Sequence, residues 1–398
     1  MLTRNSLLRF TPQSGPPFIK KRRTNIFQKS IKTLAVETSC DDTCVAILED
    51  NRILCNLKKT LSTVVQDGGI IPTKAHVHHQ QSLAPLVREA LTKANINNVS
   101  QDIDLICVTR GPGMPGSLSV GLDFCKGLSI GANNNNKSAP KLIGVHHMLG
   151  HLLIPLMFDP HIKFPLCSLL CSGGHTVFVY SHNYYTHEII CDTVDIAIGD
   201  SLDKCGRELG IRGNMIAKEM EKYITSNRNI INTNAQNIYQ LPKPLSNKAG
   251  RKNVLAFSFA GYISAVRKML SNVPVVKYPE FAYHIQETAF QHLIDKIKLS
   301  IELGKIKTNN TKNLQFVCSG GVGSNMRLRK KLEDQLPFKS FHYPPLDMCT
   351  DNAVMIGWAG MKLYESLNGV TTDLGATPLK KWSLPDLLKV DGWCHTNK

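Results

Sequence analysis

The 398-residue sequence is poor in the features that mark zinc-ribbon, disulfide-rich and membrane-spanning proteins. It has 12 cysteines but no Cys-x-x-Cys pair, and even Cys40/Cys44 and Cys167/Cys171 have three residues between them. This spacing fits neither a zinc ribbon nor a disulfide framework, so we expect reduced and mostly buried thiols. Apolar runs such as Leu152–Phe158 are far shorter than the roughly 20 residues of a membrane helix. We therefore expect no membrane span.

Acidic residues are absent from the first 36 positions, which carry eight Lys and Arg residues. No apolar core follows Met1, so the segment does not resemble a secretory signal. An Arg-bearing, acid-free leader is typical of a mitochondrial transit peptide, predicted here as residues 1–30, with the mature chain in the matrix. The alternative is a basic arm that stays attached and binds nucleic acid. The formal charge is +16, of which +8 remains beyond residue 36, and this favours a polyanionic partner.

The rest of the chain has an ordinary globular composition, with 42% hydrophobic and 20% charged residues. It reads as two similar halves, each with two strands joined by a hydroxyl-rich turn, then a strand that runs into a glycine loop and a helix. In the first half the turn is predicted at Glu37–Thr43 and the glycine loop at 111–116. In the second half they are predicted at 172–176 and 319–325. Repetition of this order indicates an internal duplication.

The predicted fold class is α/β, a duplicated two-lobed fold like that of actin, Hsp70 and the sugar kinases, with a central nucleotide and metal cleft. We expect an N-terminal lobe at 31–150. A C-terminal lobe follows at 151–365, with a helical insertion at about 195–300. Residues 366–398 form a C-terminal extension.

His147 and His151 give the sharpest chemical signal. Four residues apart on a helix, they share one face, which suits two imidazoles on one metal ion. A metalloprotease would need Glu after the first of these histidines, where the sequence has Met148. Asp351, just before the apolar segment Ala353–Leu363, is a carboxylate that can complete an open two-His, one-Asp site. Simple packing or capping roles for these three residues stay open.

Two turns suit phosphate or acyl chemistry. Asp41, in the first hairpin turn, can act as a base or order the turn. Exposed amides in the turn at Ser172 can bind a phosphate or carbamoyl oxygen, and a GxSxG nucleophile elbow is absent. The loop 111–116 matches GxGxxG, but after Asp123 the next acid is Asp159, so a dinucleotide site lacks its ribose-binding carboxylate about 20 residues on.

Eight short motifs occur in the order of one known family, the TsaD-like tRNA threonylcarbamoyladenosine transferases, which the chain resembles from about Leu34 to Gly360. The motifs begin at Glu37, Gly111, His147, Ser172, Leu202, Phe257, Gly320 and Pro344. The leader implies the mitochondrial branch. The resemblance implies transfer of a threonylcarbamoyl group from threonylcarbamoyl-adenylate to the exocyclic amine of the adenosine 3′ of the anticodon. The tRNAs concerned read codons that begin with A, and AMP is released.

The resemblance also implies site residues. His147, His151 and Asp351 would bind one divalent metal ion, iron or zinc. Apart from the resemblance, the attacking amine must lose a proton, and Asp41 is the candidate general base for this step. Substrate contacts are expected from a turn, a ribose-binding acid, a nucleoside-contacting glycine and an adenylate-contacting amide: Leu170, Cys171, Ser172, Gly173, Gly174, Asp203, Gly213 and Asn325.

The expected partners are mitochondrial tRNA, a separate synthase that supplies the adenylate, and a second copy in a homodimer. Basic residues outside the leader are expected to contact tRNA, among them Lys248, Arg251, Lys252, Arg267 and Lys268. The chain departs from the family pattern after Leu209-Gly210, where it is apparently three residues shorter. A metalloprotease and a nucleotide-dependent kinase or binding protein remain the alternatives.

Overall fold

The computed structural model describes residues 30–62, 70–132, 139–213, 215–232, 238–245, 253–306 and 311–395. The predicted transit peptide, apart from Ser30, lies outside the described residues. Within these ranges, no helix combines the length and the apolar character that crossing a bilayer requires.

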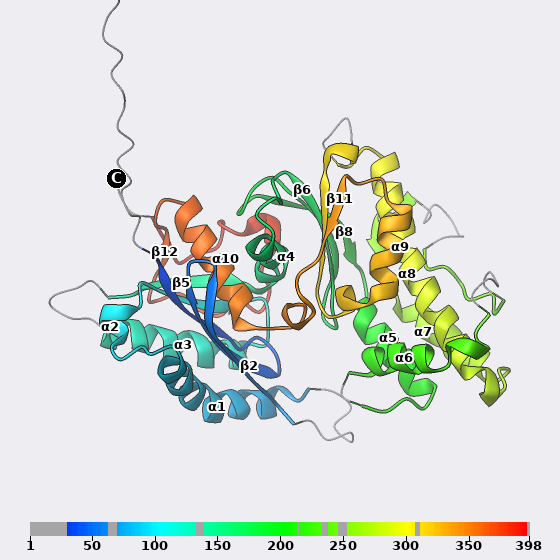
Figure 1. The fold of residues 1–398 in the computed structure, drawn as a ribbon, viewed down its shortest axis with the longest axis horizontal. Coiled ribbons are helices and arrows are strands. Elements are labelled where there is room, and N and C mark those ends of the chain that lie inside the picture. Colours follow the sequence, from blue (N-terminus) through cyan, green and yellow to red (C-terminus); the bar gives the residue numbers. More distant parts are fainter. Residues whose placement is uncertain are drawn as a thin grey trace, which may run out of the picture. The chain divides into compact units, whose positions relative to one another are not determined.

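The first half of the chain builds a five-stranded sheet of order β3-β2-β1-β4-β5 (Figure 1). Its strands are β1 Lys32–Glu37, β2 Asp42–Glu49, β3 Arg52–Thr60, β4 Leu105–Gly111 and β5 Lys141–His146. β1 pairs antiparallel with β2 and parallel with β4, so the sheet is mixed. The central strands are buried on both faces, which explains their continuous apolar sequence.

The second half repeats this plan with a six-stranded sheet of order β11-β10-β6-β7-β8-β9. Its strands are β6 Leu166–Cys171, β7 Thr176–Ser181, β8 His187–Thr193, β9 Ala256–Phe257, β10 Gln315–Ser319 and β11 Ser340–His342. β6 pairs antiparallel with β7 and parallel with β10, as β1 does with β2 and β4. The predicted duplication and the α/β fold class of the actin, Hsp70 and sugar-kinase type are thus confirmed, with β9 as an added edge strand.

Helices connect many of the strands and pack on the sheets. In the first half these are α1 Pro72–Lys93, α2 Val99–Asp102 and α3 Pro115–Gly131. The second half adds α5 Ile198–Glu208, α6 Ile216–Ser226, α7 Ala260–Leu270, α8 Tyr278–Glu302 and α9 Met326–Gln335, besides short 3-10 turns. α1 and α3 pack on one face of the first sheet (Figure 1). α5 to α8 lie between β8 and β10 in the chain, close to the helical insertion predicted at about 195–300.

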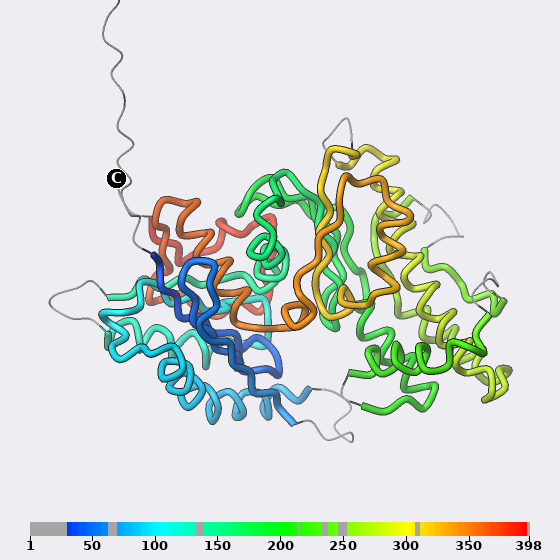
Figure 2. The backbone as a smooth tube through the Cα atoms, in the orientation of Figure 1, coloured from blue at the N-terminus to red at the C-terminus, as the bar shows by residue number. Residues whose placement is uncertain are grey.

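Two helices occupy equivalent places in the two halves: α4 His147–Phe158 follows β5, and α10 Ala353–Ser366 follows β11. They pack against each other, and α4 also contacts β6 and β10. α10 lies within the predicted C-terminal lobe, yet it packs on β1, β2 and β4 of the first sheet (Figure 2). One continuous core of buried side chains joins both sheets through these helices. The exact lobe boundaries stay a prediction.

Strand ends differ slightly from the sequence expectation. β1 continues through Glu37 and β2 already begins at Asp42, so the first turn is shorter than predicted. β6 ends at Cys171, just before the turn predicted at 172–176, and its last residues, Leu170 and Cys171, are fully buried. Gly320 has a φ of +89°, and a Cβ atom there would lie 2.3 Å from the carbonyl oxygen of Cys171. Only glycine fits that close approach without strain.

Candidate active site

The two predicted metal ligands of the first half lie at the start of α4. His146 ends β5 and is the N-cap of this helix, so the following residue, His147, is placed directly at the strand's carboxyl end. His151 lies one turn later, and the two imidazole rings have centroids 5.0 Å apart. Both side chains are buried. The helical spacing therefore brings both rings to one face, as the sequence predicts.

Asp351 joins them from the loop before α10. Its Oδ1 lies 3.0 Å from Nε2 of His151 and 3.6 Å from Nε2 of His147. One potential ligand atom from each of the three residues lies within 4.8 Å of the others. Two imidazoles and one carboxylate form an open donor set that leaves coordination positions for a substrate.

A buried carboxylate that our sequence reasoning did not select orients the first histidine. Oε2 of Glu37 lies 3.2 Å from Nδ1 of His147 and also accepts a hydrogen bond from the Thr109 hydroxyl group. Oε1 of Glu37 accepts the backbone N–H of Ser39 at 2.6 Å. A carboxylate on Nδ1 directs the Nε2 lone pair towards the metal position, which is the usual outer-shell arrangement. The signal in the sequence was an acid at the end of an otherwise apolar strand.

The charges of this cluster favour a cation. Burial opposes the charged ring, yet Glu37 and Asp351 together raise the pKa of His147 to about 9. His147 and His151 keep the pKa of Asp351 below its ordinary range despite its burial. Without a metal ion the two carboxylates thus retain a proton on His147, and a divalent cation can take the place of that proton. The residues present therefore fit a divalent metal ion.

His175 is a second neighbour missed by the sequence reasoning. It follows the glycine turn after β6, and its ring centroid lies 6.0 Å from that of His147. Burial, then the nearby His147 and His151, lower its pKa to about 4. A neutral imidazole from the second half therefore faces the candidate metal ligands of the first half.

Asp41 lies in the first hairpin turn, between β1 and β2. Burial, followed by the charge of Asp42, raises the pKa of its carboxyl group, and the Asp351 charge contributes to the same effect. His79 of α1 fixes this turn, because its Nε2 lies 2.9 Å from the Cys40 carbonyl oxygen and its Nδ1 lies 2.8 Å from the Thr43 hydroxyl oxygen. The turn is therefore a braced element.

The equivalent turn of the second half presents backbone instead of acids. Ser172 closes it, since its hydroxyl oxygen accepts the N–H groups of Gly174 and His175 at 3.3 and 3.0 Å. Gly173 and Gly174 are exposed, and a Cβ atom on either would meet nothing within 4 Å. This surface is open to a ligand, whereas Leu170 and Cys171 are fully buried at the end of β6.

The three remaining predicted substrate residues gather around α6. Oδ1 of Asp203 accepts the N–H of Ala217 at 2.6 Å, in the first turn of that helix. Gly213, with a φ of +143°, precedes it. Glu221 of α6 hydrogen-bonds to Asn325, whose own Oδ1 caps α9 by accepting the N–H of Arg327 at 2.9 Å. The Ser172 turn is linked to this group through its carbonyl, which accepts the Gly199 N–H at 3.2 Å in α5.

Of the basic residues predicted to contact tRNA, Lys248, Arg251 and Lys252 lie outside the described residues. Lys268 is exposed, and Arg267 forms an ion pair with Glu208 at 2.5 Å, which offsets part of its charge.

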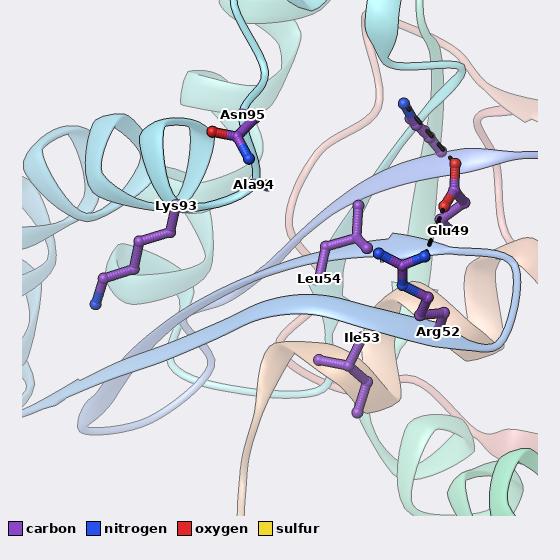
Figure 3. A pocket seen from close by; sticks show the side chains of 8 residues that line it. Glu49, Arg52, Ile53, Leu54, Lys93, Ala94 and Asn95 are labelled. Atoms are coloured by element: carbon purple, nitrogen blue, oxygen red, sulfur yellow. Dashed lines mark ion pairs between the residues drawn. The ribbon is translucent and has the colours of Figure 1, made fainter.

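A pocket elsewhere contains none of the predicted site residues. It lies between the β2–β3 turn and the end of α1, where Glu49 forms ion pairs of 3.8 Å with both Lys32 and Arg52 (Figure 3). None of its lining residues is a candidate metal ligand or belongs to a glycine turn.

Fold and site together define a two-lobed α/β protein of the actin, Hsp70 and sugar-kinase type with a candidate metal centre at the junction of its halves. The sequence model of the tRNA N6-adenosine threonylcarbamoyltransferases matches residues 52–358. The chain belongs to this family of transferases.

Relatives with that function are similar over most of the chain. The mitochondrial tRNA N6-adenosine threonylcarbamoyltransferase of Schizosaccharomyces pombe is 37% identical over 93% of this chain and 91% of its own length. The Borreliella burgdorferi enzyme is 35% identical over 84% of this chain and 90% of its own length. Among solved structures, component A of the (R)-2-hydroxyglutaryl-CoA dehydratase of Acidaminococcus fermentans matches with a TM-score of 0.48 and 16% identity, over 84% of this chain and 97% of that one.

Proposed function

We propose that this protein transfers the threonylcarbamoyl group of threonylcarbamoyl-adenylate to the exocyclic amine of the adenosine 3′ of the anticodon, in mitochondrial tRNAs that read codons beginning with A. The cluster of His147, His151 and Asp351 carries this proposal, together with the family of the chain. In the reaction a bond forms between the amine nitrogen and the carbamoyl carbon. The bond from that carbon to the phosphate oxygen breaks, and AMP leaves with the electron pair.

A divalent ion on these three residues, iron or zinc, would supply Lewis-acid polarisation and a template for the carbamoyl and threonine oxygens. Glu37 holds His147 in the orientation this requires. The exposed turn at Gly173 and Gly174 binds a substrate oxygen atom, with the Gly173 amide as the donor, because the Gly174 N–H is already bonded to the Ser172 hydroxyl oxygen. Backbone groups of Leu170 and Cys171 and the Ser172 hydroxyl complete the same turn.

On the nucleotide side, Asp203 receives the ribose hydroxyl groups, while Gly213 and Asn325 contact the nucleoside. These three residues lie around α6, so this one helix connects the proposed ribose-binding residue with the residues proposed to contact the nucleoside. Such positioning lets the amine reach the carbamoyl carbon in one orientation.

Asp41 acts as the general base. The amine loses a proton as it attacks, and a carboxylate with a raised pKa accepts that proton readily near neutral pH. Because His79 braces the turn, the carboxylate is held in place while the substrate reacts.

We further propose that the chain works in the mitochondrial matrix after removal of residues 1–30, as a homodimer supplied with adenylate by a separate synthase. The acid-free leader and the mitochondrial relative support this location. The alternatives are weaker: Met148 replaces the base of a metalloprotease, and a kinase leaves the two-His, one-Asp cluster without a role.

The test is a reconstituted reaction with chain 31–398, tRNA, ATP, threonine and bicarbonate, with and without a separate adenylate-forming enzyme. We expect threonylcarbamoyladenosine in the tRNA only when both proteins are present, and AMP released in step with it. Modification without the second enzyme would contradict the division of labour, and phosphate transfer to a small substrate would favour the kinase.

A further inference from the structure

His146 has no part in the chemistry above, although it directly precedes a metal ligand. Its side chain is fully buried, and it is the N-cap of α4. Nδ1 lies 3.1 Å from the backbone nitrogen of Met148, and Nε2 lies 3.0 Å from the carbonyl oxygen of Trp382. The ring also packs against the Trp382 indole, with centroids 4.9 Å apart.

These two partners fix the protonation of the ring. A carbonyl oxygen can only accept a hydrogen bond, so Nε2 carries the hydrogen, and a backbone N–H can only donate, so Nδ1 has the lone pair. His146 is therefore one neutral tautomer that is bonded at both nitrogens. A ring bound in this way cannot rotate without losing one of the two bonds.

Trp382 belongs to a part of the chain that the proposed chemistry also leaves unused. Residues 370–393, called here the C-terminal segment, bond to the ends of the strands that enter the site. The Thr372 hydroxyl oxygen accepts the N–H of Gly144 in β5 at 2.7 Å. Nε of Arg110, at the end of β4, donates to the Thr377 carbonyl oxygen at 2.9 Å, and the Arg110 carbonyl accepts the Leu379 N–H at 2.8 Å.

The equivalent cap in the second half is built differently. Asn352 is the N-cap of α10 and directly follows the ligand Asp351. Its Nδ2 donates to the carbonyls of Thr350 and Met348 at 2.8 and 3.3 Å, within its own loop. The capping side chain of α10 is thus bonded within its own loop and helix, whereas that of α4 is also bonded to a segment 236 residues away in the chain.

We propose that His146 is a positioning residue of the metal centre, and that the C-terminal segment, through the Trp382 carbonyl, fixes the start of α4 so that His147 and His151 meet Asp351. The inference rests on the metal ligands of the proposed function. It predicts that metal affinity depends on a residue that does not touch the metal ion. Outer-shell partners of metal ligands typically change affinity by about ten- to a hundredfold.

Zinc affinity of the full chain, measured by competition with a chelator, tests this. We expect His146→Ala to weaken zinc binding by about tenfold or more. His146→Asn should lie between this variant and the unchanged chain, because Asn can cap α4, as Asn352 caps α10, but is too short to keep the Trp382 bond as well. His292→Gln is the matched control, a histidine in α8 that is 2% exposed and far from the ligands in the chain, and we expect unchanged zinc affinity there.

Unchanged zinc affinity in His146→Ala would overturn the inference, and so would an equal loss in His292→Gln, which would indicate general destabilisation. Full affinity in His146→Asn would leave the cap intact but reject the role of the C-terminal segment. If His146→Ala does not fold, the comparison of His146→Asn with His292→Gln decides the matter. Undiminished zinc binding in His147→Ala would instead refute the metal site of the proposed function, so the two failures can be told apart.

Discussion

The hairpin turn at the head of one half and that of the other occupy the same topological position and present different chemical groups. The end of β1 and the turn to β2 carry Glu37, Ser39 and Asp41, so this side contributes carboxylates: Glu37 lies against His147, and Asp41 is the proposed proton acceptor. Between β6 and β7 it places Ser172, two exposed glycines and His175, so this turn contributes amides and a neutral ring. Duplication thus supplied two similar frames, and in the proposed function one turn contributes acid–base groups while the other binds oxygen atoms.

The candidate metal ligands allow a second comparison of the two halves, because they lie at or near the starts of the equivalent helices α4 and α10. Replacing both His147 and His151 by Ala removes two of three ligands from one half. We expect loss of stoichiometric metal and a fall in transfer of about a thousandfold or more, with the fold retained, since a buried charged ring is replaced by a small side chain. Metal analysis and a transfer assay measure both. Full metal content in the double variant would refute the site.

The proposed difference in role between the two turns can be tested by substituting one residue in each. Asp41→Asn keeps size and most hydrogen bonding but removes basicity, so we expect single-turnover transfer to slow by about a hundredfold while adenylate binding persists. Ser172→Ala, in the equivalent turn, should weaken adenylate binding more than the transfer step. Equal single-turnover rates for Asp41→Asn and the unchanged chain would reject Asp41 as the base. Lost adenylate binding in Asp41→Asn would assign it a structural role.

Glycines in the loops after β4 and β10 each lie close to the hairpin turn of their own half. Replacing them by alanine compares how tightly the loop and the turn pack in the two halves. A Cβ atom on Gly320 would lie 2.3 Å from the Cys171 carbonyl oxygen, and one on Gly113 would lie 2.8 Å from that of Ser39. We expect Gly320→Ala to lower the free energy of unfolding by about 2 kcal/mol or more, because the close contact adds to a strained φ. Gly113→Ala should cost less, since its φ is ordinary.

The control is Gly261→Ala in α7, where nothing lies within 4 Å of the added carbon. Alanine there should be neutral or stabilise the helix by up to about 1 kcal/mol. Denaturant unfolding compares the three variants, and a Gly320→Ala protein as stable as Gly261→Ala would contradict the packing argument.

A buried histidine of α8, His292, should make the second half sensitive to acid. Nε2 of His292 accepts the Ser258 N–H at 3.3 Å, so the ring must be neutral, and burial lowers its pKa to about 4. The unfolded chain binds this proton with a pKa near 6.5, so the stabilisation is complete above pH 6.5 and is lost as pH falls towards 4. The loss amounts to about 3 kcal/mol at most.

Denaturant unfolding at pH 7.5, 6 and 4.5 measures this. The unchanged chain should lose stability over this range, and His292→Gln should be less stable at pH 7.5 but fall less steeply on acidification. Parallel pH profiles for the two proteins would show that His292 is not the group responsible.

Local sequence was sufficient for the repeated order of elements and for the pairing of His147 with His151. Apolar strands that end in polar or glycine-rich turns are encoded residue by residue, and a spacing of four on a helix places His147 and His151 on one face whatever the rest of the chain does. The residues at which each strand begins and ends were harder to predict from local sequence. β1 continues through Glu37 because Glu37 pairs with Cys44 of β2, and this pairing is not visible in either strand alone.

Only the tertiary structure decided which distant groups meet in the site. Glu37 reaches His147, His175 turns towards the same ring, and Asp351 arrives from a loop 200 residues beyond His151. The packing of α10 on the first sheet and the hydrogen bond between His146 and the Trp382 carbonyl oxygen are also contacts between segments that are far apart in the chain. Local patterns fix how a segment folds, but contacts between segments depend on which apolar faces cover one another, and that is settled only when the whole core is packed.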